Sequence, residues 1–225
     1  IMKRAVSLAL AAVMLLSLAA CGGGKNKRAF EASKAAYDNV NAAYEITEEY
    51  GSDIYEAWRL GIYDKDEILK DGCSYLAKEL HISEEEIVAG VAYSIAEASG
   101  ESWDELSEDD KSSYGLGADY SFTVMKDSLF SWCVEVASNA YAANGEAEKV
   151  QGYLSEAKEQ MKNLSDKYSD YEHYPALKGY FTTTSSFFGF CQDPTGSFEQ
   201  LKTTIEDYKT SARDYKADLD YVFEE

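Results

Sequence analysis

In FEASKAAYDNVNAAYEITEEYGSDIYEAW, residues 30–58, aromatic, aliphatic and small residues recur at alternating intervals of three and four residues. They are Phe30, Ser33, Tyr37, Val40, Tyr44, Thr47, Gly51, Ile54 and Trp58. Such spacing places a continuous seam on one face of an α-helix, and alanines and charged residues fill the other positions. The stretch therefore predicts a single helix over residues 29–61, about 50 Å long.

Helix starts are marked further along the chain by capping-box spacing, in which an oxygen-bearing side chain precedes Glu or Gln by three residues. The pairs are Asp64–Glu67, Ser83–Glu86, Ser102–Glu105 and Ser197–Gln200. Together with the apolar period, these starts predict helices near residues 65–80, 84–98, 118–144, 146–171, 175–191 and 197–223.

The fold class that these elements predict is all-α: an elongated antiparallel bundle of six or seven helices within an acidic domain, residues 29–225. The sequence has no alternation of strands and helices, which argues against a two-lobed α/β architecture. Residues 100–117 are rich in Ser, Asp and Glu. We expect a loop with one short helix there, and it is the best candidate for a boundary within the domain.

The second half of the chain contains a candidate repeat with a shift of 51 residues. The aligned seams are Val150, Leu154, Ala157, Met161, Leu164, Tyr168 and Leu201, Ile205, Tyr208, Ala212, Tyr215, Leu219. Gly145 falls on Gly196, so each unit is expected to be a helical hairpin that turns at a glycine. Cys133 and Cys191 would then lie about 10 Å apart along equivalent helices, too far for a disulfide, and we predict that they are not bonded.

The stretch GYFTTTSSFFGFC, Gly179–Cys191, has no charged residue. Its neighbours on both sides are helical in pattern, so we expect a helix that is the central and most buried one. An alternative is that Thr182 to Ser186 line an internal polar pocket.

The first 20 residues have the pattern of a secretory signal peptide. Lys3 and Arg4 form a basic start, and the following sixteen residues carry no charge and end in small side chains. The apolar segment is shorter than the roughly 20 residues of a typical transmembrane helix.

The end of that segment, Leu18-Ala19-Ala20-Cys21, resembles the lipobox of bacterial lipoproteins. The resemblance implies that residues 1–20 are removed and that Cys21 carries a diacylglyceryl group. Two acyl chains are enough for stable anchoring. Residues 21–28, with three glycines, would then form a flexible tether. We therefore expect a lipid-anchored protein on the extracytoplasmic face of the cell membrane.

The charge balance is strongly acidic, with 21 basic and 41 acidic residues. Removing Lys3 and Arg4 with the signal peptide takes the net charge from −20 to −22. This argues against a nucleic-acid partner, which requires a basic footprint. It favours a well-solvated surface.

No motif for chemistry was found in the sequence. It lacks a phosphate loop, a dinucleotide fingerprint, a zinc-protease motif and a nucleophile elbow. Two histidines have no cysteine at metal-site spacing. Cys73, Cys133 and Cys191 are expected to be free, buried thiols. We therefore expect no enzymatic activity, no metal and no cofactor.

Two functions fit these observations. The first is a non-catalytic structural or interaction module with a protein or cell-wall partner. The second is a helical ligand-binding lipoprotein, in which some of the 18 tyrosines and the tryptophans line a groove for a sugar or a peptide. The candidate groove residues are Trp58, Trp132, Tyr180 and Thr183.

Overall fold

The computed structural model describes residues 25–223, and within this range every regular element is helical. The α-helices are α2 (Lys25–Tyr63), α3 (Lys65–Leu80), α4 (Glu84–Ala98), α5 (Glu108–Gly115), α6 (Ala118–Val124), α7 (Leu129–Ala143), α8 (Glu146–Tyr168), α9 (Tyr174–Gln192) and α10 (Phe198–Phe223). Two short 3₁₀ helices, η1 (Trp103–Glu105) and η2 (Lys126–Ser128), lie between them. The predicted all-α bundle is confirmed.

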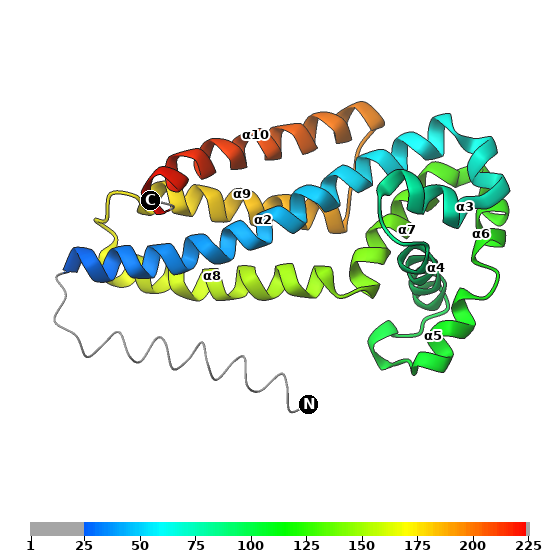
Figure 1. Cartoon of the computed structure of the whole chain (residues 1–225), viewed down its shortest axis with the longest axis horizontal. Helices are drawn as coiled ribbons and strands as arrows, with labels where there is room; N and C mark the ends of the chain where they lie inside the picture. The colour runs from blue at the N-terminus through cyan, green and yellow to red at the C-terminus, as the bar shows by residue number, and fades with distance from the viewer. Residues whose placement is uncertain (1–24, 224–225) are drawn as a thin grey trace.

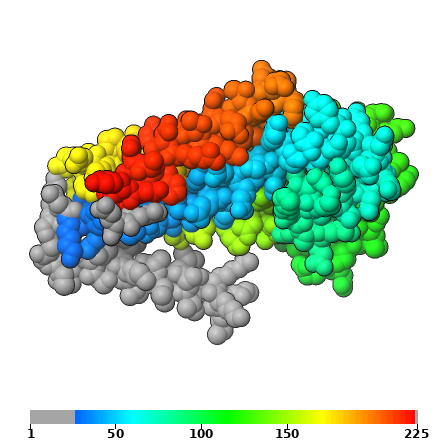
Figure 2. All heavy atoms as spheres, turned by 45° about the horizontal axis from the view of Figure 1, so that its top comes forward, coloured from blue at the N-terminus to red at the C-terminus, as the bar shows by residue number. Residues whose placement is uncertain are grey.

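The helices form two parts that share α2 (Figure 1). In the first part, which we call the long bundle, α8, α9 and α10 pack along α2. In the second part, which we call the head, α3 to α7 surround the C-terminal end of α2. The space-filling view shows the long bundle as a narrow body that ends in the wider head (Figure 2).

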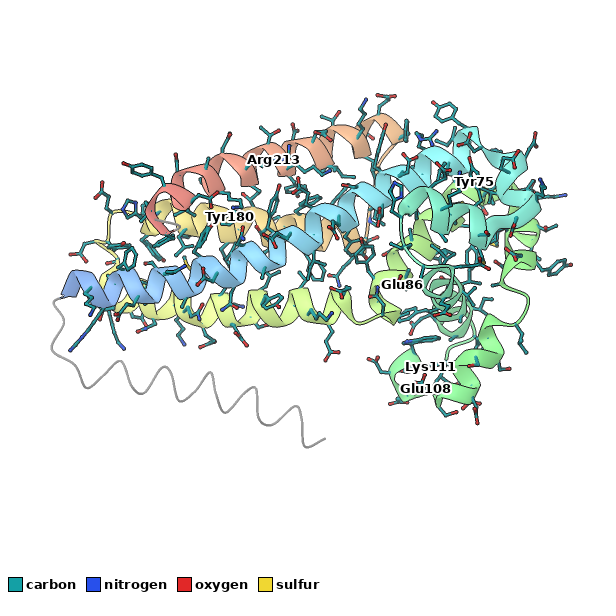
Figure 3. All side chains as sticks on the ribbon, viewed as in Figure 1. Tyr75, Glu86, Glu108, Lys111, Tyr180 and Arg213 are labelled. Atoms are coloured by element: carbon teal, nitrogen blue, oxygen red, sulfur yellow. The ribbon has the colours of Figure 1, made fainter. Side chains whose placement is uncertain are left out.

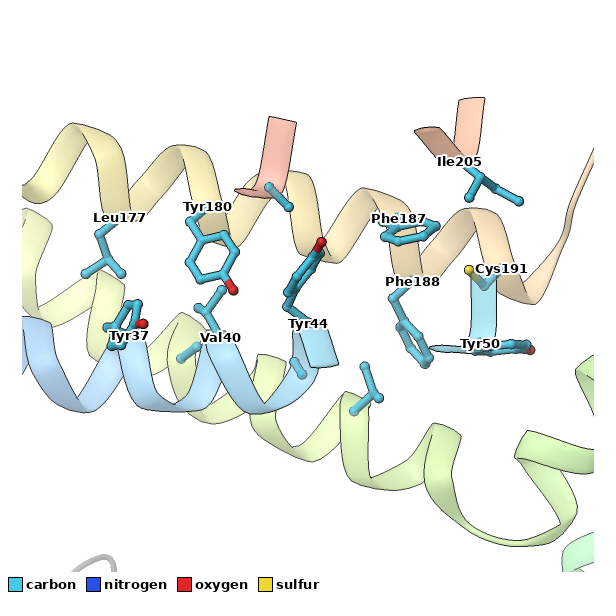
Figure 4. Close-up of a cluster of buried hydrophobic side chains, with 14 of the residues drawn as sticks. Tyr37, Val40, Tyr44, Tyr50, Leu177, Tyr180, Phe187, Phe188, Cys191 and Ile205 are labelled. Atoms are coloured by element: carbon cyan, nitrogen blue, oxygen red, sulfur yellow. The ribbon is translucent and has the colours of Figure 1, made fainter. Parts of the chain in front are cut away.

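The seam that predicted α2 lies inside the core of the long bundle. All of its positions except Phe30 are buried. They meet buried side chains from the facing helices, among them Leu177, Tyr180 and Phe187 of α9 (Figure 4). The predicted seams of α8 and α10 face the same core, and their central residues, such as Ala157 and Ala212, have no exposed surface. On the outside, Arg213 of α10 pairs with Glu48 of α2 (Figure 3).

The head has a core of its own, built mainly by α3, α4, α6 and α7. Its fully buried residues include Leu76, Ile87, Phe122 and Val136. The α4 and α7 backbones approach closely at Gly90, where a Cβ atom would overlap the carbonyl oxygen of Val136. Glycine at this position therefore sets the distance between the two helices.

Most predicted helix limits agree with the structure to within a few residues, but the helix expected over 118–144 is divided. Residues 118–124 form α6, η2 follows, and α7 begins at Leu129. This separation lets Phe122 of α6 pack over Gly72 of α3, while α7 packs against α4. One straight helix could not make both contacts.

Two of the four predicted capping boxes form. Ser83 and Glu86 bond reciprocally at the start of α4, and Ser197 and Gln200 do so before α10. Asp64 makes no cap bond because its carboxylate instead accepts from Tyr75 and faces Arg59.

Ser102 also makes no cap hydrogen bond, because it precedes only one short 3₁₀ turn. The next serine, Ser107, caps α5 instead and accepts a hydrogen bond from the backbone of Asp110.

The hairpin repeat is correct for only one of its two units. Gly145 and Gly196 both have positive φ and lie in the connections between helices, as expected of turn glycines. After Gly196, α10 folds back along α9. At Gly145 the chain bends but does not fold back, since α7 packs on α4 and α2 and meets α8 mainly at the connection. The apolar periods match, but the partners of the helices differ.

Residues 100–117 do not separate two cores. The helix before them, α4, packs in the head against both α6 and α7, which follow them. Within the segment, Trp103 is 7% exposed and packs with Ala92 and Ala96 of α4. The two cores instead meet along α2, near Ala57 and Trp58.

The uncharged stretch Gly179–Cys191 is helical, as predicted, but it is not buried on all sides. Tyr180, Phe187 and Cys191 face the core, whereas Thr182 and Ser186 are exposed. Three helices contact α9, which leaves part of its surface to solvent.

The proposed signal peptide, lipobox and Cys21 lie outside the described residues. The helix α2 begins at Lys25, so residues 25–28 of the expected tether belong to that helix. Across residues 25–223, no helix combines the length and the apolarity that crossing a membrane requires.

Candidate functional site

The four aromatic and hydroxyl residues predicted to line one groove lie in different places. Trp132 is buried in the head core, where its indole N–H donates to Ser121. Tyr180 is buried in the long bundle. Trp58 and Thr183 border two different hollows, Trp58 at the junction of the two cores and Thr183 on the outer side of α9. The four residues therefore do not line one groove.

Five tyrosines, Tyr37, Tyr44, Tyr50, Tyr141 and Tyr180, are buried in the core of the long bundle, and several of their hydroxyls bond to other helices. Tyr180 donates to Asn41 over 3.1 Å, and the Tyr50 hydroxyl lies 2.7 Å from that of Ser138. Burial raises the pKa of Tyr44 to about 12 and also raises that of Tyr180. These rings fill the space between helices and do not form an open binding surface (Figure 4).

A hollow of about 270 Å³ lies where α2, α7 and the end of α9 meet. We call it the Trp58 hollow. It is lined by Trp58, Phe130, Ser131, Val134, Glu135, Ser138, Asn139, Gln192, Asp193 and Pro194. The rings of Trp58 and Phe130 stack with centroids 5.8 Å apart and form its apolar wall. Sequence positions far apart are thus brought together at the junction of the two cores.

The charges that line the Trp58 hollow are all negative. Glu135 and Asp193 are the ionisable residues of its lining, and no lysine or arginine is among them. Partial desolvation raises the pKa of Glu135. An anion at this position, without a cation beside it, makes the hollow electrostatically suited to positive ligands.

A second, shallower hollow of about 370 Å³ lies between α9 and α10. It is lined by Thr182, Thr183, Ser186, Thr204, Asp207, Tyr208 and Ser211. The predicted polar pocket around Thr182 to Ser186 therefore exists as a surface feature and not as an internal one. Its hydroxyls are open to solvent and converge on no buried polar group.

Three exposed apolar side chains, which we call the α6 stripe, lie on α6 and just before it. Leu116, Tyr120 and Val124 are 82%, 70% and 62% exposed. Tyr120 and Val124 lie four residues apart on one face of the helix, whereas Leu116 precedes the helix and is separated from it by Gly117, whose φ is positive. The opposite face of α6 carries Ala118 and Phe122, which are buried in the head. Figure 1 places α6 at the end of the molecule opposite the start of α2.

No group of side chains in residues 25–223 is arranged to hold a metal ion. Cys73, Cys133 and Cys191 are buried and free, which agrees with the prediction that Cys133 and Cys191 are not bonded. Burial raises the pKa of each thiol, that of Cys133 to about 12. These thiols are protonated at neutral pH and lack the environment of a reactive cysteine.

Two features were missed from the sequence. The sequence does not reveal the α6 stripe, because its apolar pattern predicts one continuous helix over residues 118–144 and not a separate α6. The Trp58 hollow could not be recognised, since Glu135 and Asp193 lie on segments that approach only in the folded chain. The sole available signal was the spacing of Leu116, Tyr120 and Val124.

Comparison with known proteins gives no relative to which a function could be compared. No protein-family model matches the chain, and neither a curated protein nor a solved structure matches it.

Proposed function

We propose that the chain is a membrane-anchored extracytoplasmic lipoprotein whose helical domain acts as a non-catalytic protein-interaction module. The observation that supports this most directly is the α6 stripe of Leu116, Tyr120 and Val124. Exposed apolar side chains grouped on one face are typical of protein-binding surfaces. The partner would be a protein with a complementary apolar patch.

The position of the stripe fits an anchored module. In this proposal the lipid on Cys21 holds the chain four residues before α2 begins at Lys25. The 39 residues of α2 extend about 58 Å from that point. The head, with α6 at its outer end, would then be held away from the membrane and toward a partner (Figure 1).

The tight interior also favours an interaction module over a binding protein with a large cavity. Tyr180 and four other tyrosines are core residues, and the two hollows described above are small and lie at the surface. An aromatic ligand site remains a second candidate function because Trp58 and Phe130 form a wall of the Trp58 hollow.

Site-specific photo-cross-linking tests the interaction surface. A photoreactive phenylalanine replaces Tyr120 in the full chain expressed in its native cells, and Tyr221 serves as a matched control. Tyr221 is 76% exposed but lies near the end of α10. We expect a discrete adduct at position 120 that Leu116→Asp abolishes, and none at 221. Equal adducts at both positions, or none at either, would contradict the proposed surface.

Cell fractionation tests the anchor separately. We expect the wild-type chain in the membrane fraction and the Cys21→Ala variant outside it, because the variant lacks the lipidated sulfur. A Cys73→Ala variant keeps Cys21 and serves as the control. Equal membrane association of the Cys21→Ala chain would overturn the lipoprotein assignment but leave the α6 stripe untouched.

A further inference from the structure

We propose that the Trp58 hollow binds the ammonium group of a small alkylamine, with Glu135 as the principal counter-charge. This site is distinct from the α6 stripe. The proposal rests on the shape of the hollow, the sign of its charges and the hydrogen-bonding groups that its lining leaves free.

The shape of the hollow suits a small molecule. Its volume of about 270 Å³ lies at or just below the low end of ligand pockets, which span about 300 to 1,000 Å³. Trp58, Phe130 and Val134 supply apolar surface for a short alkyl chain. Long peptides and oligosaccharides would extend beyond it. The dimensions therefore favour a ligand with a short carbon chain and one polar end.

The charges favour a cation at the polar end. Glu135 forms no hydrogen bond or ion pair with another side chain in residues 25–223, and the same holds for the Asp193 carboxylate. Glu135 and Asp193 are both solvent-exposed, and partial desolvation of Glu135, which raises its pKa, places only a small cost on its ionised form. An ammonium group would offset that cost, and the acidic surface of the chain would attract it.

The hydrogen-bonding groups of the lining point to a ligand that donates. Asn139 donates its amide N–H to Ser94 over 2.8 Å, which leaves its carbonyl oxygen as an acceptor. Ser138 is already paired with Tyr50. The carboxylates of Glu135 and Asp193 only accept when ionised. An ammonium group has three donors and no acceptor, so its chemistry matches these groups.

A neutral sugar fits this lining less well. Its hydroxyl groups both donate and accept hydrogen bonds, whereas the two carboxylates of the lining only accept, and a neutral ligand gains nothing from their charge. The lining of the hollow therefore favours an amine over the sugar or peptide that the aromatic residues of the sequence suggested.

Calorimetry with two matched probes tests the proposal on the purified full-length chain. The probes are n-butylammonium and n-butanol, which have the same carbon chain and differ in charge. We expect n-butylammonium to bind at least tenfold more tightly than n-butanol, and more tightly at low than at high salt. Equal affinity for the two probes, or no heat from n-butylammonium at millimolar concentrations, would overturn the proposal.

Two variants with the same change in charge locate the site. Glu135→Gln should weaken n-butylammonium binding at least tenfold. Glu148→Gln, on the exposed surface of α8, should weaken it less than twofold. Circular dichroism and thermal unfolding check that both variants fold. Equal loss in the two variants would show that the acidic surface as a whole attracts the amine and that there is no defined site.

The ammonium group could come from two sources, a free small amine or the lysine side chain of a protein. Nα-acetyl-lysine amide distinguishes them, because it carries the same butylammonium end attached to backbone atoms. Binding as tight as that of n-butylammonium indicates that the hollow accepts a lysine side chain. Binding at least tenfold weaker indicates a free small amine.

Discussion

The phenol of Tyr141 on α7 donates a 2.8 Å hydrogen bond to the carboxylate of Asp53 on α2. Tyr141 also stacks on Tyr50, with ring centroids 4.2 Å apart. Tyr50 and Tyr141 belong to the core of the long bundle, although α7 is a helix of the head. Together with the contact of Tyr50 and Ser138, this hydrogen bond links the two parts at their junction.

Asp53 should make the stability of the protein depend on pH. Burial raises the pKa of this carboxyl from 3.8 to about 6, and the Tyr141 bond opposes that rise only in part. Since the folded-state pKa lies above the unfolded value, the stabilisation is full below pH 3.8 and is lost as pH rises through 6. We expect wild type to lose up to about 3 kcal/mol relative to Asp53→Asn over this interval. Urea unfolding of both proteins between pH 4 and 7.5 measures the difference, and a difference that is constant with pH would contradict this account.

The close approach of α4 and α7 predicts opposite effects for two glycine substitutions. Gly90→Ala places a Cβ against the α7 backbone, and we expect a loss of about 1–3 kcal/mol or more. Gly152→Ala is the matched control, because this glycine lies exposed in α8 with open space around it. It should raise stability by about 0.5–1 kcal/mol through helix propensity. Chemical denaturation compares the two, and similar effects would indicate that the helices can move apart at Gly90.

The Ser83 capping box should contribute measurably to the stability of α4. Ser83→Ala removes the acceptor of the Glu86 backbone N–H, and we expect a cost of about 1 kcal/mol. Ser102 has the same spacing to a glutamate but caps nothing. Ser102→Ala should therefore change the unfolding free energy by less than about 0.5 kcal/mol. If both variants lose the same amount, the structural difference between the two sites is not energetically important.

The three internal thiols should be inert until the protein unfolds. Burial protects Cys73, Cys133 and Cys191 and raises their pKa values. In a Cys21→Ser chain, Ellman's reagent at pH 8 should find almost no reactive thiol under native conditions. It should find three after denaturation in urea without reductant. A native count of one or more would show that a thiol is accessible, and fewer than three after unfolding would show a disulfide.

The positions of the helices could be predicted because their signals are local. The seam of α2, the cap at Ser83 and the turn glycine Gly196 each specify an element from neighbouring residues alone. The partners of the helices could not be predicted in this way. Gly145 and Gly196 both have positive φ, yet only the second lies between helices that pack together along their length. That outcome depends on α4 and α2, because they cover the faces of α7 that α8 would otherwise contact.

The candidate site was less predictable than the fold. Of the predicted candidates, Trp58 and Thr183 each border a hollow, but Phe130 and Glu135, which line the Trp58 hollow, have no local signal in the sequence. Trp132 and Tyr180 are residue types that often line binding sites, but here both are buried in the core. A tyrosine or tryptophan on a helix seam gives the same sequence pattern in either role. What distinguishes them is whether a third segment covers the ring, and that is a property of the folded chain.

The continuity of α2 has a mechanical consequence. Because one uninterrupted helix enters both cores, a load applied to the head is carried along a single strut to Lys25. Within α2 the helix is not interrupted between the two cores. A pull on the head would therefore be transmitted along this helix toward its first residue, with the fastening of Tyr141 to Asp53 resisting any bend at the junction.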